Sequence, residues 1–333
     1  MNSVILEKSI MLEDFPVIEV SKIFEGFLAP VTATVASRLI EKGYGISYPV
    51  EMDEFGIPNE NSEITRDTVS AIMDDNNAAL CNDVFGKYRQ LAAENRCCYI
   101  HPTYGTVSRF GLVPLVSSMD QVGVLCKNAR DGFALLSHIA GNDEKDGAMF
   151  LEESYNYTAS EQDITIAIPD GMQMPEGKFN TVPITLEYFN VYKQVMYTLS
   201  YAELSHNINR YDGIKFGYRA EEYRNVEELY VNTRTESLGL PVKLAAIMGA
   251  AVLANDKYTS VYEKAMKIRR LIKQSLLFDL YDIIALPSDT HELTVLAGLP
   301  SVSFHYKGQD IQLVANVKNE NILLKAWEVC HEV

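Results

Sequence analysis

Apolar and polar positions follow two repeating patterns along this chain, one typical of helices and one typical of strands. Residues 128–141 start with the capping residue Asn128, carry an apolar stripe at helical spacing and end in glycine, which predicts a helix. Residues 32–43 show the same organisation over a shorter stretch. Residues 242–274 are strongly helical, with a predicted break at Asn255-Asp256.

Short apolar runs rich in β-branched residues predict strands between these helices. They cover residues 46–50, 164–171, 282–287, 301–306 and 311–315, and a final helix holds Trp327. Strands and helices alternate near both ends of the chain, which predicts class α/β with a mixed, largely buried sheet between helical layers. No Pro/Ser-rich linker, low-complexity tract or internal repeat interrupts the sequence, so we expect residues 1–333 to form a single domain.

The composition is that of a globular protein, with 333 residues of which 47% are hydrophobic. No run of about 18 apolar residues is present, so no membrane-spanning helix is predicted. The first residues, MNSVILEKSIMLEDF, lack the basic region, apolar run and cleavage site of a signal peptide. We therefore expect a cytoplasmic protein.

Charge and metal-ligand spacing restrict the partners. The net charge of −16 disfavours nucleic-acid binding unless a local basic stripe exists, and the densest candidate is the short segment 267–273. The five cysteines have no zinc-type spacing, and mostly buried thiols are expected. His291-Glu292 lacks the second histidine of a metal-binding helix motif. No metal and no cofactor is predicted, although the alternative function below admits a bound cofactor.

Three long segments carry a resemblance to a known family. They are HPTYGTVSRFGLVPLVSSMDQVGVLC (101–126), NRYDGIKFGYRAEEYRNVEELYVNTRTESLG (209–239) and EKAMKIRRLIKQ (263–274), with shorter matches such as MDEFG (52–56) and LAGLP (296–300). In this order they resemble the amidase signature family, and within it the A subunits of glutamyl-tRNA(Gln) amidotransferases. The resemblance covers nearly the whole chain from about residue 4. It implies one α/β/α domain with a large mixed sheet.

The resemblance also implies a mechanism for comparison. Family members hydrolyse amides with a lysine on an early strand that takes a proton through a serine on a cis peptide. That relay activates a nucleophilic serine in a glycine-rich loop, because a hydroxyl is a poor nucleophile without a hydrogen-bonded base. The loop's N–H groups form the oxyanion hole, and glycine lets the backbone approach the substrate.

This chain departs from the family at the nucleophile loop. Residues 81–90, CNDVFGKYRQ, lie where the family has GSDTGGSIRQ. Lys87 therefore stands at the nucleophile position, Phe85 replaces a loop glycine, and Gly86 is kept. The segment 74–79, where the cis-peptide serine is expected, contains no serine, and no Gly-Gly pair occurs anywhere.

The base position is altered as well. Ungapped counting from Ser21-Lys22 puts Glu7 at the catalytic lysine position, with Lys8 one residue away, and a one-residue shift would restore the lysine. Loss of a nucleophile alone can reduce turnover by about 10⁶. We expect no amidase activity by the family mechanism. The chain is also shortened relative to the family, whose N-terminal helical region has no counterpart here.

Candidate ligand-binding residues remain. Arg269 matches an arginine that helps to hold glutamine in the family, and Asp289 is a candidate for a substrate-contacting aspartate. Tyr218 lies in a segment that lines the substrate side in the family, while Asp120 and Gln121 belong to the retained SSMDQ motif. A guanidinium is suited to a two-pronged pair with a carboxylate. The alternative roles are packing and loop hydrogen bonds for Asp120 and Gln121, core packing for Tyr218, and a pair with an acidic neighbour for Arg269.

Two classes of function follow. The favoured hypothesis is a non-catalytic pseudoenzyme that acts as a binding or regulatory component of a complex. Its partner would be a paralogous amidotransferase-type subunit or a neighbouring enzyme, and its ligand a small carboxylate or amide. The alternative is an enzyme with altered chemistry in the same cleft, using Lys87, Cys81 or a bound cofactor. A third hypothesis, a tRNA-amidating subunit, conflicts with the missing triad.

Overall fold

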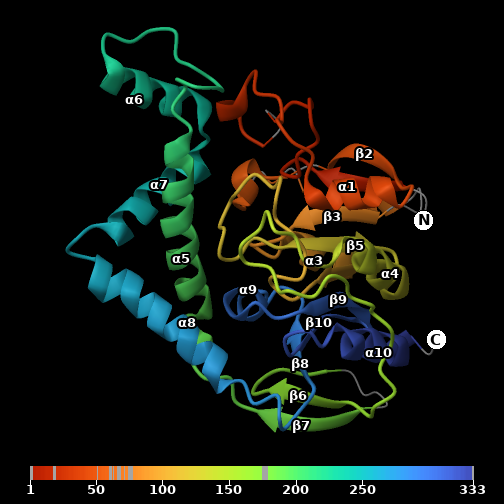
Figure 1. Ribbon diagram of the computed structural model, residues 1–333. Helices are drawn as coiled ribbons and strands as arrows, with labels where there is room; N and C mark the ends of the chain where they lie inside the picture. The colour runs from red at the N-terminus through yellow and green to blue at the C-terminus, as the bar shows by residue number, and fades with distance from the viewer. Residues whose placement is uncertain are drawn as a thin grey trace.

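A ten-stranded sheet forms the centre of the molecule (Figure 1). The computed structural model describes residues 3–17, 20–50, 52–59, 62, 64–65, 69–70, 72–73, 78–174 and 179–331. In spatial order the strands are β2, β1, β3, β5, β4, β9, β10, β8, β6 and β7. Their bounds are β1 Ser3–Glu7, β2 Gly45–Val50, β3 Ala78–Asn82, β4 Cys98–His101, β5 Val122–Cys126, β6 Thr165–Pro169, β7 Asn180–Ile184, β8 Ile283–Pro287, β9 Ser301–Tyr306 and β10 Gln309–Ala315.

Helices cover both faces of this sheet. Their bounds are α1 Thr34–Glu41, α3 Lys87–Glu94, α4 Ala129–Ile139, α5 Tyr192–Asn207, α6 Val226–Ser237, α7 Leu240–Leu253, α8 Glu263–Ser275, α9 Glu292–Ala297 and α10 Glu320–His331. β1 pairs in parallel with β2 and β3, and β6 pairs in parallel with β7 and β8. The five pairs between β3 and β8 in the spatial order are antiparallel: β3–β5, β5–β4, β4–β9, β9–β10 and β10–β8. The predicted α/β class with a mixed sheet between helical layers is confirmed.

The alternation of side chains along each strand separates two hydrophobic cores. Val4 and Leu6 of β1 belong to the core under α1, α4 and α10, whereas Ile5 packs against the core under α3, α5 and α9. Glu7 is two residues beyond Ile5 and lies on that second face after an irregularity in the strand pairing. A polar residue at this place is therefore buried under α3 and α5.

The predicted helices and strands are present, with some unpredicted elements beside them. Residues 128–141 form α4, whose cap Asn128 accepts a hydrogen bond from the Asp131 amide. The long helical stretch divides into α7 and α8 around residues 254–262, as the Asn255-Asp256 break predicted. The sequence patterns did not identify β1, β3, β4, β5 and β7, nor the helices α3, α5, α6 and α9.

Helices α5, α7 and α8 group on the side of the molecule opposite the chain ends (Figure 1). α7 lies against α5, and Gly249 is at their closest approach, since a Cβ there would lie 1.9 Å from the Tyr201 carbonyl oxygen. Among the helices of the described ranges, none has the length and apolar content that a membrane span requires.

Candidate functional site

The sequence match predicts the nucleophile loop in the connection from β3 to α3. This connection consists of residues 83–86, between Asn82 at the end of β3 and Lys87 at the start of α3. Gly86 has φ +78°, and a Cβ there would lie 2.4 Å from His291 Nδ1. A side chain at Gly86 is excluded by both the backbone conformation and this contact. The kept glycine therefore packs against α9.

Asp83 binds the first turn of α3. Its carboxylate accepts hydrogen bonds from the backbone amides of Tyr88 at 2.9 Å and Arg89 at 3.0 Å, and from Arg89 Nε at 2.9 Å. Both charged side chains are buried. The N–H groups that a helix start offers to an anionic ligand are thus bound to an internal carboxylate.

Arg89 extends this network to the other half of the chain. Its Nη1 donates to Thr294 Oγ1 at 2.6 Å and to Gln312 Oε1 at 3.0 Å, so it ties α3 to α9 and β10. Burial of an arginine is favourable only when its charge and N–H groups are matched in this way. Arg89 belongs to the kept part of the loop sequence, but its structural role depends on partners more than 200 residues away.

Phe85 and Lys87 are the two residues of this connection that the sequence match predicts in place of a loop glycine and the nucleophile. Phe85 is 8% exposed and packs against Tyr197 of α5, with ring centroids 5.6 Å apart. Lys87 is the first residue of α3 and is half-buried.

Cys81 lies fully buried within β3, and burial raises its pKa well above the usual thiol value. A protonated thiol without solvent access is a poor nucleophile.

The side chains of Glu7 and Lys8, at the end of β1, have different surroundings. The Glu7 carboxyl accepts hydrogen bonds from the Asn82 amide and from Ser9 Oγ, the latter at 3.1 Å. Burial raises the pKa of Glu7 to about 8. Lys8 is also buried but lines an open cleft. Of the two candidates for the base position, Glu7 contacts the end of β3 and Lys8 faces the cleft.

Asn82 joins three of the predicted site residues. Its backbone N–H donates to Glu7 Oε2, and its side-chain Nδ2 donates to Asp120 Oδ1 at 2.9 Å. Its side-chain Oδ1 accepts a hydrogen bond from the backbone N–H of Gln121 at 3.1 Å. Asp120 also accepts hydrogen bonds from the backbone amides of Leu115 and Val116. Burial raises the pKa of Asp120 to about 6. No sequence signal singled out Asn82, since asparagine at a strand end is common in turns.

Gln121 has an unusual environment. Its side chain is buried, and within the described part of the chain neither Oε1 nor Nε2 has a hydrogen-bond partner. An unpaired buried amide is energetically costly. Asn82 thus connects the Glu7 and Asp120 side chains and the Gln121 backbone in one polar cluster at the end of β3.

Arg269 lies elsewhere, at the contact of α8 with the turn before β5. Its Nε donates to the Leu296 carbonyl at 2.7 Å, and Nη1 and Nη2 donate to Oγ and the carbonyl of Ser118, both at 3.0 Å. Burial lowers the pKa of Arg269. Arg270, the next residue along α8, is exposed.

The remaining candidates are apart from Arg269. Asp289 is exposed after β8, and its carbonyl contacts His291 Nδ1 at 3.3 Å. The Tyr218 hydroxyl donates to Glu236 at 2.5 Å, and Lys22 lies over its ring. Among the hydrogen bonds and ion pairs of the described residues, none joins Arg269, Asp289 and Tyr218.

A cleft of about 1280 Å³ is lined by Lys8 just after β1, by the 52–59 loop and by the start of α7. Its floor includes Glu54, which accepts a hydrogen bond from Ser21 Oγ at 2.5 Å and from the Gly239 amide at 2.8 Å. Burial raises the pKa of Glu54. Phe85, Lys87 and Arg269 do not line this cleft.

His291 packs inside the protein. It precedes α9 and contacts Gly86, and burial lowers its pKa. Within the described ranges, no group of three His, Cys, Asp or Glu side chains is arranged to hold a metal ion. Of the segment 74–79, residues 74–77 lie outside the described residues, and Ala78 and Ala79 begin β3.

Comparisons with known proteins agree with this fold. Residues 74–177 and 171–318 match the family model described as Amidase. The chain is 32% identical to the A subunit of glutamyl-tRNA(Gln) amidotransferase from Lachnoclostridium phytofermentans over 351 positions, which cover 85% of this chain and 70% of the relative. It is 31% identical to the corresponding protein of Coxiella burnetii over 374 positions, which cover 91% of this chain and 77% of the relative.

Solved structures show the same architecture. The A subunit of glutamyl-tRNA(Gln) amidotransferase from Thermotoga maritima superposes with a TM-score of 0.72 at 21% identity, covering 97% of this chain and 81% of that one. An amidase family protein from Bacillus anthracis gives a TM-score of 0.72 at 16% identity, covering 98% and 76%. With the family model, the curated relatives and the fold in agreement, the chain belongs to the amidase signature family.

Proposed function

We propose that this chain is a non-catalytic member of the amidase family that serves as a binding or regulatory subunit. The observation that carries the proposal is the altered β3–α3 connection. Lys87 stands at the predicted nucleophile position, and Phe85, at a predicted loop-glycine position, packs against Tyr197 of α5. A lysine in place of serine removes the hydroxyl that a neighbouring base would activate, and the Phe85 ring takes the space that a loop glycine leaves for a substrate carbonyl.

The altered base position supports the same conclusion. Both oxygens of Glu7 accept hydrogen bonds from protein donors, and the side chain is 1% exposed. A carboxyl buried with its own donors lacks access to a substrate proton, and access is the first requirement for a general base. The chain retains the fold around this cluster while the parts needed for amide hydrolysis are replaced.

The proposed partner is a protein of the amidotransferase type. The curated relatives are named as subunits, and a chain without chemistry of its own can still contribute a binding surface. We propose a paralogous amidotransferase-type subunit, or an enzyme encoded nearby, as this partner. Purification of the chain from its native source should yield a complex of fixed stoichiometry with such a protein, and isolation of the free monomer alone would contradict this assignment.

An activity assay tests the catalytic part of the proposal. Purified wild type, Lys87→Ala and Cys81→Ala are incubated with glutamine, asparagine and simple aryl amides, and ammonia or amine release is measured. An active family member provides the positive control. We expect no release above buffer from any of the three proteins. Turnover by the wild type that either substitution abolishes would instead establish the alternative, an enzyme with altered catalytic residues.

A small carboxylate ligand at Arg269 belongs to the same proposal. Three of the five guanidinium hydrogens are donated to protein oxygens, so one hydrogen on each terminal nitrogen remains for a ligand. Thermal shift of the wild type and Arg269→Ala against amino acids and dipeptides tests this. A ligand should raise the midpoint of the wild type only. If no carboxylate stabilises the wild type at millimolar concentration, the protein-partner role stands without a ligand at Arg269.

A further inference from the structure

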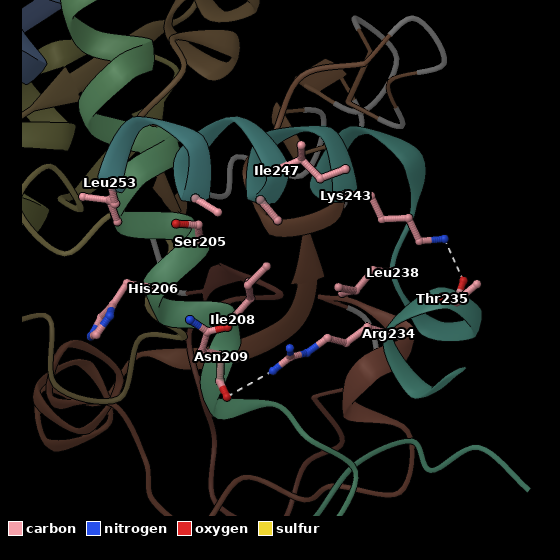
Figure 2. A pocket seen from close by; sticks show the side chains of 12 residues that line it. Ser205, His206, Ile208, Asn209, Arg234, Thr235, Leu238, Lys243, Ile247 and Leu253 are labelled. Atoms are coloured by element: carbon pink, nitrogen blue, oxygen red, sulfur yellow. Dashed lines mark hydrogen bonds between the residues drawn. The ribbon is translucent and has the colours of Figure 1, made fainter. Parts of the chain in front are cut away.

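A second cavity lies away from the polar cluster, between the end of α5, the end of α6 and one side of α7 (Figure 2). Its volume is about 430 Å³, within the range of small-molecule sites, about 300–1,000 Å³. We call it the α5–α7 groove. None of the residues discussed for the β3–α3 connection lines it.

The walls of the groove are apolar. Ile208 and Leu238 are buried at its base, and Ile247 on the α7 side is 67% exposed. Ala246 and Ala250 complete the α7 wall with small side chains, which leaves room above the base. Water in contact with such surface is unfavourable by about 25 cal/mol per Å², so an aliphatic group that displaces it gains free energy.

The charged groups of the groove are cationic. Arg234 and Lys243 are among the lining residues, and none of the described lining residues is acidic, although the whole chain has a net charge of −16. Neither Arg234 nor Lys243 forms an ion pair with a described carboxylate. An arginine in this situation, beside an apolar groove, is complementary to an anionic head group.

Arg234 has capacity left for such a group. Figure 2 shows its side chain beside Leu238, with one bond from Nη2 to the Asn209 carbonyl at 3.3 Å. Its Nε is buried and has no hydrogen-bond partner within the described part of the chain. Lys243 donates to the Thr235 carbonyl at 2.6 Å and lies near the start of α7. Arg234 is therefore the residue best placed to bind a ligand at the apolar base.

We propose that the α5–α7 groove binds a small aliphatic carboxylate, with the carboxylate on Arg234 and the hydrocarbon chain against Ile208, Leu238 and Ile247. The guanidinium of Arg234 has N–H groups without a partner among the described residues and matches a carboxylate, and the short apolar wall matches a hydrocarbon chain. A protein partner would need about 800 Å² on each side for a stable interface, which is more than a groove of this volume supplies by itself. The proposal is independent of the function proposed for the β3–α3 region.

Calorimetric titration with octanoate tests the assignment, with octylamine and 1-octanol as probes of the same chain length. The variants are Arg234→Gln, which removes the charge, and Ala250→Leu, which adds bulk on the exposed face of α7. Arg270→Gln, an exposed arginine outside the groove, is the matched control. Circular dichroism and the thermal midpoint confirm that each variant is folded.

We expect saturable octanoate binding by the wild type and by Arg270→Gln. Arg234→Gln and Ala250→Leu should each weaken it by about tenfold or more, because one removes the charged hydrogen bond and the other fills the groove. Octylamine should not bind measurably, and 1-octanol should bind more weakly than octanoate. The assignment fails if the wild type does not bind octanoate at millimolar concentration, if either groove variant keeps the wild-type affinity, or if octylamine binds as tightly as octanoate.

Discussion

At the scale of single residues, the interior of this protein is organised by buried carboxyl groups with their own donors. Glu7, Asp83 and Asp120 all lie near the ends of β1, β3 and β5, and Asn82 connects two of them. Asp83 is neutralised by Arg89, whereas the donors to Glu7 are neutral. Because these neutral donors do not compensate its charge, the protonation state of Glu7 must depend on burial.

The first prediction concerns Glu7 and pH. In the folded chain its pKa is about 8, against 4.5 for the free side chain. Unfolding therefore releases a proton between these values, and the stability present below pH 4.5 is lost as the pH rises to about 8. The slope approaches about 1.4 kcal/mol per pH unit. Glu7→Gln should remove this loss, measured as urea unfolding free energy from about pH 5 to about pH 8.

The control for this experiment is Glu41→Gln, which changes an exposed carboxyl at the end of α1. The unfolding free energy of Glu41→Gln should fall with pH as in the wild type. Asp120, with a pKa raised to about 6, also lowers the unfolding free energy as the pH rises, and it does so in the wild type and in both variants. An unchanged slope in Glu7→Gln would show that Glu7 is ionised in the folded protein.

At the scale of elements, the placement of α7 depends on one glycine. α7 packs along α5, and Gly249 faces the Tyr201 carbonyl without intervening side-chain atoms. The close packing of α7 on α5 at Gly249 also positions one wall of the α5–α7 groove, since Ala246 and Ala250 of α7 line the groove and lie on either side of Gly249 in sequence. The helix interior otherwise disfavours glycine relative to alanine by about 1 kcal/mol.

The second prediction follows from this contact. Gly249→Ala should destabilise the protein by about 1–3 kcal/mol despite the gain in helix propensity, because the new Cβ would lie 1.9 Å from the Tyr201 oxygen and force the helices apart. Denaturant unfolding measures the change. Gly147→Ala is the control, since a Cβ there has no atom within 4 Å. Equal stability of both variants would show that α7 moves without cost.

At the scale of the whole molecule, acidity dominates. The net charge is −16. The basic segment 267–273 presents fewer cations to solvent than its sequence contains, because the Arg269 guanidinium turns inward and donates to Ser118. Lys267, Arg270 and Lys273 remain exposed. A short row of three cations can neutralise few phosphates.

The third prediction is therefore that the protein does not bind tRNA at about 0.15 M salt. Filter binding or electrophoretic mobility shift with bulk tRNA measures this, with an unrelated basic tRNA-binding protein as positive control. Retention of tRNA with an affinity that falls steeply as salt increases would reveal a basic surface that the described residues do not account for.

Much of the fold and part of the site could be predicted from the sequence. The capped helix at 128–141, the break between α7 and α8 and the strands near the C-terminus follow from local patterns, since caps, turns and apolar spacing act over a few residues. β1 and β3 were missed, because short, largely buried strands have little polar alternation to mark them. Their pairing depends on distant segments.

The sequence by itself determined the family and the α/β class, because these depend on residue identity and order. Lys87 at the nucleophile position stays a prediction from the same sequence match. Only the tertiary structure decided what those residues contact. Arg89 meets Thr294 and Gln312, and Arg269 meets Ser118, across separations that no local pattern encodes. The α5–α7 groove likewise exists only after α6 and α7 fold back on α5. The physical reason is that burial and hydrogen bonding depend on which segments the chain brings together, whereas local propensity depends only on sequence neighbours.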